Sequence, residues 1–343
     1  MFRTTTLTLM LAAVSLLVFS SPALAVSGAG AIALEFPIGA RYNALGEAGT
    51  ALAQDVTAMW WNPGAFAFAT GAGKSNKRVH AMQSKLVPDL ADDIALYWGG
   101  YAANSFGGTF GVSMTYLSMG SQEATNDAGE VIGTFDSNSW AFGMTYGTRI
   151  THNLGVGMTV KYFRDNLAPD EFTQDQVGGS GSTFAVDAGV LWKVPAIKSN
   201  IGVAISNLGP NITHVDADQS DPLPRKMTVG VAHSVYQSDI MSLLLVGDVL
   251  IPLLDWSSEK DDYGVGLDFG EDEFGVGAEW GYDNSLFIRF GYKKGTGDIE
   301  DATYGFGVDL DKWVGQAITF GFASVPQARG LDRVTRFSFG YDF

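Results

Sequence analysis

Residues 106–116 read Phe-Gly-Gly-Thr-Phe-Gly-Val-Ser-Met-Thr-Tyr. A period of two puts the aromatic and aliphatic side chains on one face of a strand and glycine, serine and threonine on the other. A soluble sandwich would carry long charged side chains on its second face. Small residues suit the crowded interior of a barrel whose apolar face meets lipid. The stretch therefore favours a transmembrane β-barrel over a soluble sandwich.

The same alternation recurs along the chain, and aromatic residues tend to fall at the strand ends, as a membrane-interface girdle requires. Connections from residue 88 onward alternate between short and long, which is typical of outer-membrane barrels. Counting every alternating segment gives an odd number of strands, so we assign residues 263–269 to an outer loop. The result is an all-β fold, a 14-stranded antiparallel transmembrane barrel with both termini in the periplasm. The further alternating segments are residues 140–146, 154–162, 184–192, 201–205, 227–235, 274–280, 286–292, 304–310 and 318–322.

Composition excludes several classes of protein. The 343 residues include 43 glycines and no cysteine, and 46% are hydrophobic. A small disulfide-stapled domain and a disordered chain are therefore excluded. With 21 Lys and Arg against 37 Asp and Glu, the formal net charge is −16. A nucleic-acid partner is not expected, because phosphate contacts need a basic surface.

Both ends of the chain carry export signals. Residues 1–25 combine Arg3, an apolar run and a small-residue cleavage site at Ala23-Leu24-Ala25, which predicts a secretory signal peptide. No later apolar run reaches the roughly 18 residues of a spanning helix. At the other end, an amphipathic strand with a terminal aromatic is typical of the signal read by the barrel assembly machinery. Its aromatic residues are Phe337, Phe339, Tyr341 and Phe343.

Residues 26–73 do not alternate. We expect turns at Gly39, Gly46 and Gly49 and short helices at 47–54 and 57–61, the second ended by Pro63. A barrel this wide would otherwise hold water or substrate, because about eight strands are already filled by side chains. We therefore predict an N-terminal helical plug at 26–73 inside a barrel formed by 74–343. Inward glycines would give it room, and we expect them at Gly107, Gly143, Gly155, Gly189, Gly277 and Gly305.

The plug sequence resembles the PorV/PorQ family, which is related to the FadL long-chain fatty-acid transporters. The resembling segments are residues 39–49 (GARYNALGEAG), 51–64 (ALAQDVTAMWWNPG), 186–190 (VDAGV), 206–210 (SNLGP), 223–225 (LPR) and 287–292 (FIRFGY). One departure is Asn62-Pro63-Gly64-Ala65, where the family usually has Asn-Pro-Ala-Gly. The resemblance implies a 14-stranded barrel with an N-terminal plug in the bacterial outer membrane, surrounded by its lipid.

Two functions follow from the resemblance. Relatives of the PorV type serve type IX secretion and receive the C-terminal signal domains of exported cargo proteins, alongside other secretion components. Relatives of the FadL type admit hydrophobic small molecules. We take the first as the leading hypothesis and keep the second as the alternative, because fold alone does not assign function.

Candidate plug and lumen residues are Arg41, Asn62, Pro63, Asp187, Glu279 and Asp309. Arg41 is the only cation between residues 26 and 73, while Asp187, Glu279 and Asp309 are predicted to face inward. An ion pair or hydrogen bond tying the plug to the wall is favoured, since a buried arginine needs a partner. The alternative is contact with a substrate carboxylate.

Other features carry weaker hypotheses. Gly107 and Gly108 are expected to clear space for the plug, with a bend or lateral opening as the alternative. The outer loops are acidic, and a calcium site at 216–220 is less favoured than a solvated loop. Four histidines, with no cysteine and no Gly-x-Ser-x-Gly elbow, offer no catalytic site. We therefore expect no catalysis, metal or cofactor.

Overall fold

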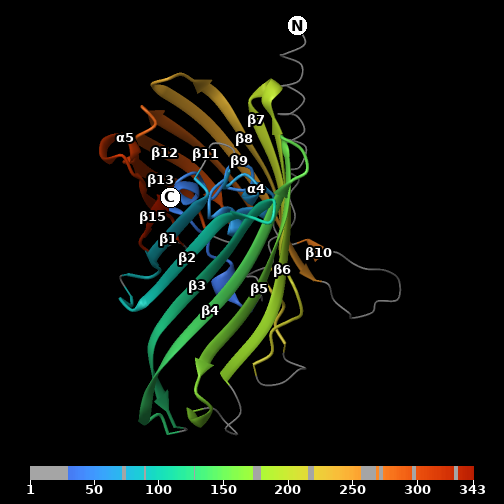
Figure 1. Ribbon diagram of the computed structural model, residues 1–343. Helices are drawn as coiled ribbons and strands as arrows, with labels where there is room; N and C mark the ends of the chain where they lie inside the picture. The colour runs from blue at the N-terminus through green and yellow to red at the C-terminus, as the bar shows by residue number, and fades with distance from the viewer. Residues whose placement is uncertain are drawn as a thin grey trace.

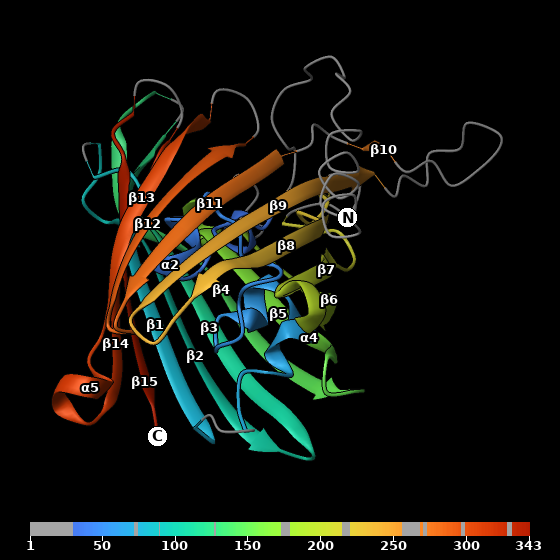
Figure 2. The ribbon, with the colours of Figure 1, turned by 90° about the horizontal axis from the view of Figure 1, so that it is seen from above.

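The computed structural model describes residues 30–71, 75–88, 90–126, 128–172, 179–214, 220–255, 268–269, 273–295, 299–327 and 331–343. In this part of the chain, strands form a closed antiparallel ring around a short helical segment (Figure 2). The predicted signal peptide lies outside the described residues. No described helix combines the length and apolar character that crossing a membrane demands.

Fourteen strands close the ring, which confirms the predicted fold class. Each wall strand pairs with the next, β9 pairs with β11, and β15 pairs back onto β1. The strands are β1 (Lys77–Lys85), β2 (Ile94–Ser105), β3 (Gly108–Thr125), β4 (Val131–Arg149), β5 (Leu154–Ala168), β6 (Gly179–Val194), β7 (Ser199–Leu208), β8 (Lys226–Gln237), β9 (Met241–Asp255), β11 (Glu273–Tyr282), β12 (Leu286–Lys294), β13 (Glu300–Asp309), β14 (Ala317–Val325) and β15 (Val334–Asp342).

The two described residues of the extra alternating segment lie outside the ring, in agreement with the prediction. Its described part is β10 (Asp268–Phe269), which pairs only with the end of β9. Residues 263–267 lie outside the described part of the chain. Leaving this segment out restores an even strand number, and short turns then gather at one end of the barrel and long connections at the other (Figure 1).

Tight turns at the short-turn end use backbone conformations that suit right-twisted hairpins. Phe106 and Gly107 join β2 to β3 with φ values of 54° and 76°, and Asp283 with Asn284 does the same between β11 and β12. Wider turns contain η4 (Pro195–Ile197) and α5 (Asp311–Val314). Gly107 is therefore a turn residue and not, as predicted, an inward residue of a strand.

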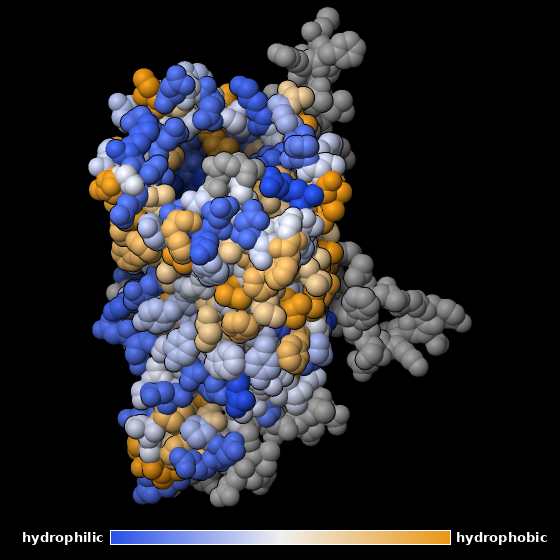
Figure 3. Space-filling model, in the orientation of Figure 1, coloured by the Kyte–Doolittle hydropathy of each residue, from blue (hydrophilic) through white to orange (hydrophobic). Residues whose placement is uncertain are grey.

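The wall is much taller on one side than on the other. β3 to β6 reach far below the rest of the ring in Figure 1, and η2 (Asp170–Phe172) lies at the end of β5. The sequence predicted loops at 119–135 and 164–182, but the strands continue to Thr125 and Ala168. Above the membrane both strand faces meet water, so no apolar alternation marks these extensions. Figure 3 shows an apolar band across the middle of the visible face.

The plug consists of η1 (Ile32–Leu34), α2 (Ala40–Asn43), α3 (Ala58–Trp61) and α4 (Pro63–Phe66), all inside the ring (Figure 2). The helix predicted at 47–54 is wrong, because Gly46 and Glu47 both adopt positive φ and turns follow them. Instead, packing supports several very short helices, which would not form in isolation.

Plug and wall approach each other through glycine. Gly155, Gly189, Gly277 and Gly305 all face plug atoms at distances that leave no room for a Cβ. A Cβ on Gly277, for example, would lie 2.6 Å from the carbonyl oxygen of Leu45. Gly143 faces inward but meets Ser113 of the wall and not the plug. The inward glycines therefore define where the plug sits.

The Gly277→Leu variant should destabilise the barrel by about 1–3 kcal/mol, because an inward side chain must displace the plug backbone. Gly247→Leu is the matched control, since Gly247 lies on the opposite, lipid-facing side of neighbouring β9 and a Cβ there makes only ordinary contacts. The measurement is the free energy of unfolding in detergent, with heat-modifiable migration on a gel as the readout of the folded barrel. Equal effects of the two substitutions would contradict the described packing.

Candidate functional site

A three-residue ion cluster joins the plug to the wall. Arg41, on α2, donates from Nε and Nη2 to the two carboxylate oxygens of Glu279 on β11, at 2.8 and 2.6 Å. Arg289, on β12, donates from Nε to the same carboxylate at 2.7 Å. Glu279 and Arg289 are almost fully buried. A bidentate pair with this geometry fixes orientation as well as charge, so the cluster can hold α2 against β11.

Several wall residues bind the plug backbone directly, among them Asp248 and Thr303. Asp248 of β9 accepts hydrogen bonds from the amides of Gly49 and Thr50 at 2.9 and 2.8 Å. Thr303 of β13 accepts from the amide of Gly46 at 2.9 Å and donates to the carbonyl of Ala44. These contacts satisfy backbone groups that a segment without long helices leaves unpaired.

Asn62 connects three backbone segments. Its amide nitrogen donates to the carbonyls of Thr50 and of Val190 on β6, and its oxygen accepts from the amide of Gly64. Pro63 follows at the first position of α4, where its missing N–H costs nothing. Because the Asn62 oxygen would lie only 2.1 Å from a Cβ on Gly189, the wall must be glycine here.

The other two predicted acidic residues lie away from Arg41. Asp187 of β6 pairs with Lys161 of β5 at 2.8 Å and accepts from the amide of Asn207. Asp309 ends β13 at the short-turn end, where it accepts from the amide of Asp311. Only Glu279 of the three candidate acids contacts Arg41 among the described residues. Asp187 instead stabilises the end of β7 through its hydrogen bond with Asn207.

A second polar cluster lies within the plug. Tyr42 donates its hydroxyl to Asp55 at 2.6 Å, and Thr57 donates both its amide and its hydroxyl to the other carboxylate oxygen. Burial raises the pKa of Asp55, but the nearby His80 and Arg78 charges and the donated hydrogen bonds more than offset this and lower it to about 2. Asp55 is therefore a carboxylate under all ordinary conditions.

Described residues of the connection between β7 and β8 pack against the plug. Ile212 and Leu223 of this connection are fully buried in the same apolar cluster as Leu34 of the plug. Gly30 donates its amide to the carbonyl of Pro222 at 2.9 Å, which joins the start of the described chain to this connection.

Two sequence segments quoted for the family resemblance meet in this connection. Asn207 donates to the carbonyl of Pro224, and Arg225 donates to the carbonyl of Gly209. Residues 206–210 and 223–225 thus form the base of one folded connection. Of the calcium motif weighed at 216–220, residues 216–219 lie outside the described residues.

The glycine pair and the final strand occupy defined places. Gly107 lies in the β2–β3 turn and Gly108 pairs with Ser105 in an unbroken ladder. A lateral opening there stays a prediction, with no gap in the described ladder to support it. Phe337, Phe339 and Tyr341 alternate along β15, and Phe343 directly follows its last residue. Both Phe337 and Phe339 are exposed on the lipid-facing side. Their role in assembly also remains a prediction.

The sequence missed Asp248, Thr303 and Lys161 as lumen residues. A charged or hydroxyl residue at an inward position of an otherwise small-residue face was the available signal. It could not be interpreted, because other inward hydroxyl residues pair within the wall, as Ser139 does with Asp165 and Thr145 does with Thr159.

The chain is similar to proteins of known class. A family described as "Type IX secretion system protein PorV" matches residues 28–249. No curated protein matches. Similar solved structures include the toluene transporters TbuX of Ralstonia pickettii and TodX of P. putida, with 14% and 12% identity. Each of these two comparisons covers 89% of this chain and 98% of the other chain, with a TM-score of 0.56.

A Pseudomonas aeruginosa FadL homologue is 13% identical, covers 89% of this chain and 98% of its own, and gives a TM-score of 0.52. At these identities the likeness to solved structures concerns the fold alone. Together the comparisons place the barrel among outer-membrane proteins.

The Glu279→Gln variant should lower the free energy of unfolding by about 3 kcal/mol, because it leaves Arg41 and Arg289 without a carboxylate in a nearly buried site. Hydrogen exchange should rise first at residues 38–49. Lys85→Gln, which breaks the exposed Lys85–Asp92 pair, is the control and should cost under about 1 kcal/mol. Unchanged exchange in the Glu279 variant would contradict a tethering role.

Asp55→Asn should cost about 2 kcal/mol near neutral pH. A lowered carboxylate pKa contributes stability above the ordinary value of 3.8, and this contribution is lost as pH falls towards 2. The stability difference between the two proteins should therefore shrink between pH 5 and pH 2.5. A difference that stays constant over this range, measured by thermal unfolding in detergent, would contradict the assignment.

Proposed function

Since the chain belongs to the family of the type IX secretion system protein PorV, we propose that it is a non-enzymatic outer-membrane receptor for exported proteins. The match over residues 28–249 is the observation that carries this proposal. The exported partner is held at the outer rim of the barrel, and the lumen is not its path.

The interior supports this assignment. The plug is bound to the wall by the Arg41–Glu279–Arg289 cluster and by hydrogen bonds to Asp248 and Thr303. Its outer side is packed beneath the β7–β8 connection. A channel for hydrophobic molecules would have to displace these contacts at each passage. The interior is thus suited to stabilising the barrel more than to conducting substrates.

The surface proposed for the partner is the outer end of the β3–β4 hairpin, residues 120–136, here named the outer ribbon. Pairing of β3 with β2 ends at the Ile94–Met119 pair, and pairing of β4 with β5 ends at the Asn138–Asn166 pair. Beyond these pairs, no described strand continues the ladder on either outside edge of the ribbon. The ribbon projects below the rim in Figure 1.

The described residues of the outer ribbon are hydrogen-bonded at the tip and partly apolar. At its tip, the Asn126 side chain accepts hydrogen bonds from the amides of Ala128 and Glu130. At its base, Phe135 stacks on Phe172 with ring centroids 5.6 Å apart. Val131 and Ile132 are 57% and 56% exposed. Strand edges with no neighbouring described strand, together with exposed β-branched residues, are suited to adding another strand, so the proposed partner element is an exposed β-strand of an exported protein.

Replacing residues 119–137 by Asn-Gly should remove partner binding while the barrel still folds. The Ser118–Asn138 pair would then close a two-residue hairpin turn, for which Asn-Gly is well suited. We expect exported proteins that co-purify with the parent barrel to fall by about tenfold, the equivalent of about 1.4 kcal/mol. Heat-modifiable migration would report folding.

The matched control replaces residues 311–315, the α5 turn at the opposite end of the barrel, and should keep partner binding. Full co-purification with the shortened hairpin would overturn the outer ribbon as the docking surface. Loss of hydrophobic small-molecule uptake on gene deletion, with exported proteins still reaching the surface, would instead favour the FadL-type alternative.

A further inference from the structure

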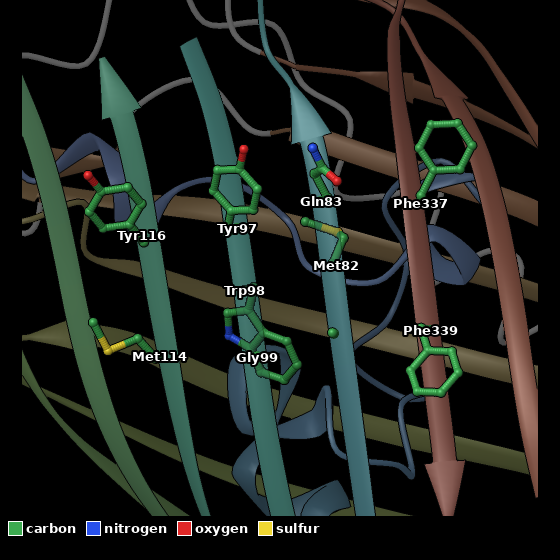
Figure 4. Close-up of a pocket in the computed structure, with 10 residues that line it drawn as sticks. Met82, Gln83, Tyr97, Trp98, Gly99, Met114, Tyr116, Phe337 and Phe339 are labelled. Carbon is green, nitrogen blue, oxygen red and sulfur yellow. The ribbon is translucent and has the colours of Figure 1, made fainter. Parts of the chain in front are cut away.

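A groove of about 510 Å³ crosses β15, β1, β2 and β3 on the lipid-facing side of the barrel (Figure 4). Its volume lies within the range of about 300–1,000 Å³ typical of small-molecule sites. Its floor consists of Ala81 and Gly99, which are direct neighbours across β1 and β2. A Cβ on Gly99 would meet no described atom within 4 Å. The floor is therefore open to an occupant.

Two rows of paired residues shape the groove. In the floor row, Met114 and Phe339 flank Gly99 and Ala81 on either side and form the walls. The row nearer the outer end consists of Tyr116, Tyr97, Gln83 and Phe337, which follow one another in register. The result is an apolar trough whose outer end carries the Gln83 amide beside the hydroxyl groups of Tyr97 and Tyr116 (Figure 4).

The outer row marks the membrane interface. β1 runs from the short-turn end at Lys77 to the long-connection end at Lys85, so Gln83 lies close to the outer surface. An aromatic row crosses the wall at this level, since Tyr97 pairs in register with Tyr116 and Tyr116 with Trp140 of β4. Such rows are found at bilayer boundaries. The floor at Ala81 and Gly99 thus lies one row deeper, at the level of acyl chains.

Gln83 has no side-chain hydrogen bond to any described residue, although it faces the membrane. At the membrane interface this amide is free to hydrogen-bond, so an occupant that offers a carbonyl or hydroxyl group there would pair with it. Lys85 follows on the same face of β1, two residues further out. Its exposed partner, Asp92, holds it only weakly, because such surface pairs contribute little.

We propose that this groove binds one lipid of the outer leaflet, an acylated glycolipid with a phosphate-bearing headgroup. One acyl chain lies along Ala81 and Gly99 between Met114 and Phe339. The Gln83 amide hydrogen-bonds to the carbonyl that links this chain to the headgroup, and Lys85 contacts the phosphate. The three groups follow one another along β1 in the same order as chain, linkage and phosphate follow one another in such a lipid.

The test is titration of the detergent-solubilised full-length barrel with purified lipid A, with bound lipid counted by native mass spectrometry. Gly99→Leu fills the floor and should weaken binding about tenfold, because the acyl chain loses its apolar contacts. Gly247→Leu adds the same side chain to the lipid-facing wall elsewhere and should bind as the parent protein does. Ala81→Leu fills the same floor from β1 and replaces Gly99→Leu if that variant does not fold.

Lys85→Gln tests the headgroup separately. It should weaken binding of lipid A by up to about fivefold, the range of one exposed ion pair. Binding of lipid A stripped of its phosphates should not change in this variant. Parent-like binding by both floor variants, or equal weakening by Gly247→Leu, would overturn the site. An equal effect of Lys85→Gln on both lipids would overturn the phosphate contact.

Discussion

The plug backbone lies in direct contact with the inner wall of the barrel, and this close approach constrains most of the structure. Where plug and wall meet, the wall must carry glycine, as at Gly189 and Gly277. Where plug amides and carbonyls meet the wall, it must carry partners for them, as Asp248 and Thr303 do. The need to leave room for the plug backbone also explains why the inward residues of the wall strands are small. The close approach of plug and wall also separates the roles of the inner and outer surfaces. Because the plug fills the lumen and is hydrogen-bonded to the wall, we assign partner recognition to the outer surface.

The outside is asymmetric, and this asymmetry gives each face its own chemistry. On the tall side, β3 and β4 rise beyond their neighbours and end in a ribbon with free strand edges, which we assign to exported partners. Beside β15, the adjacent small residues Ala81 of β1 and Gly99 of β2 leave the groove that we assign to a lipid. Both assignments use ordinary β-sheet physics: unpaired edges accept strands, and gaps between large side chains accept apolar chains.

Much of the fold could be predicted from the sequence, because lipid on one side and a crowded lumen on the other enforce strict alternation. That pattern predicts the strand count and the place of residues 268–269 outside the ring. Its absence from residues 26–73 predicts the plug. Prediction failed where the environment is the same on both sides of a strand, as in the extension to Thr125, or where packing overrides local preference, as at Glu47. Arg41 could be identified as a tethering candidate by its charge alone. Choosing Glu279 over Asp187 and Asp309 required the three-dimensional register.

A plug that stays in place while the protein works is the central claim, and a disulfide can test it directly. A Cβ on Gly321 would lie 3.3 Å from the Cβ of Ala40, near the separation of about 3.8 Å in disulfides, and the chain has no other cysteine. The measurement is co-purification of exported proteins with the oxidised Ala40→Cys, Gly321→Cys barrel. The account predicts the same binding as the parent protein, with or without reductant. Binding lost on oxidation and restored by reductant would show that the plug must move, and would contradict it.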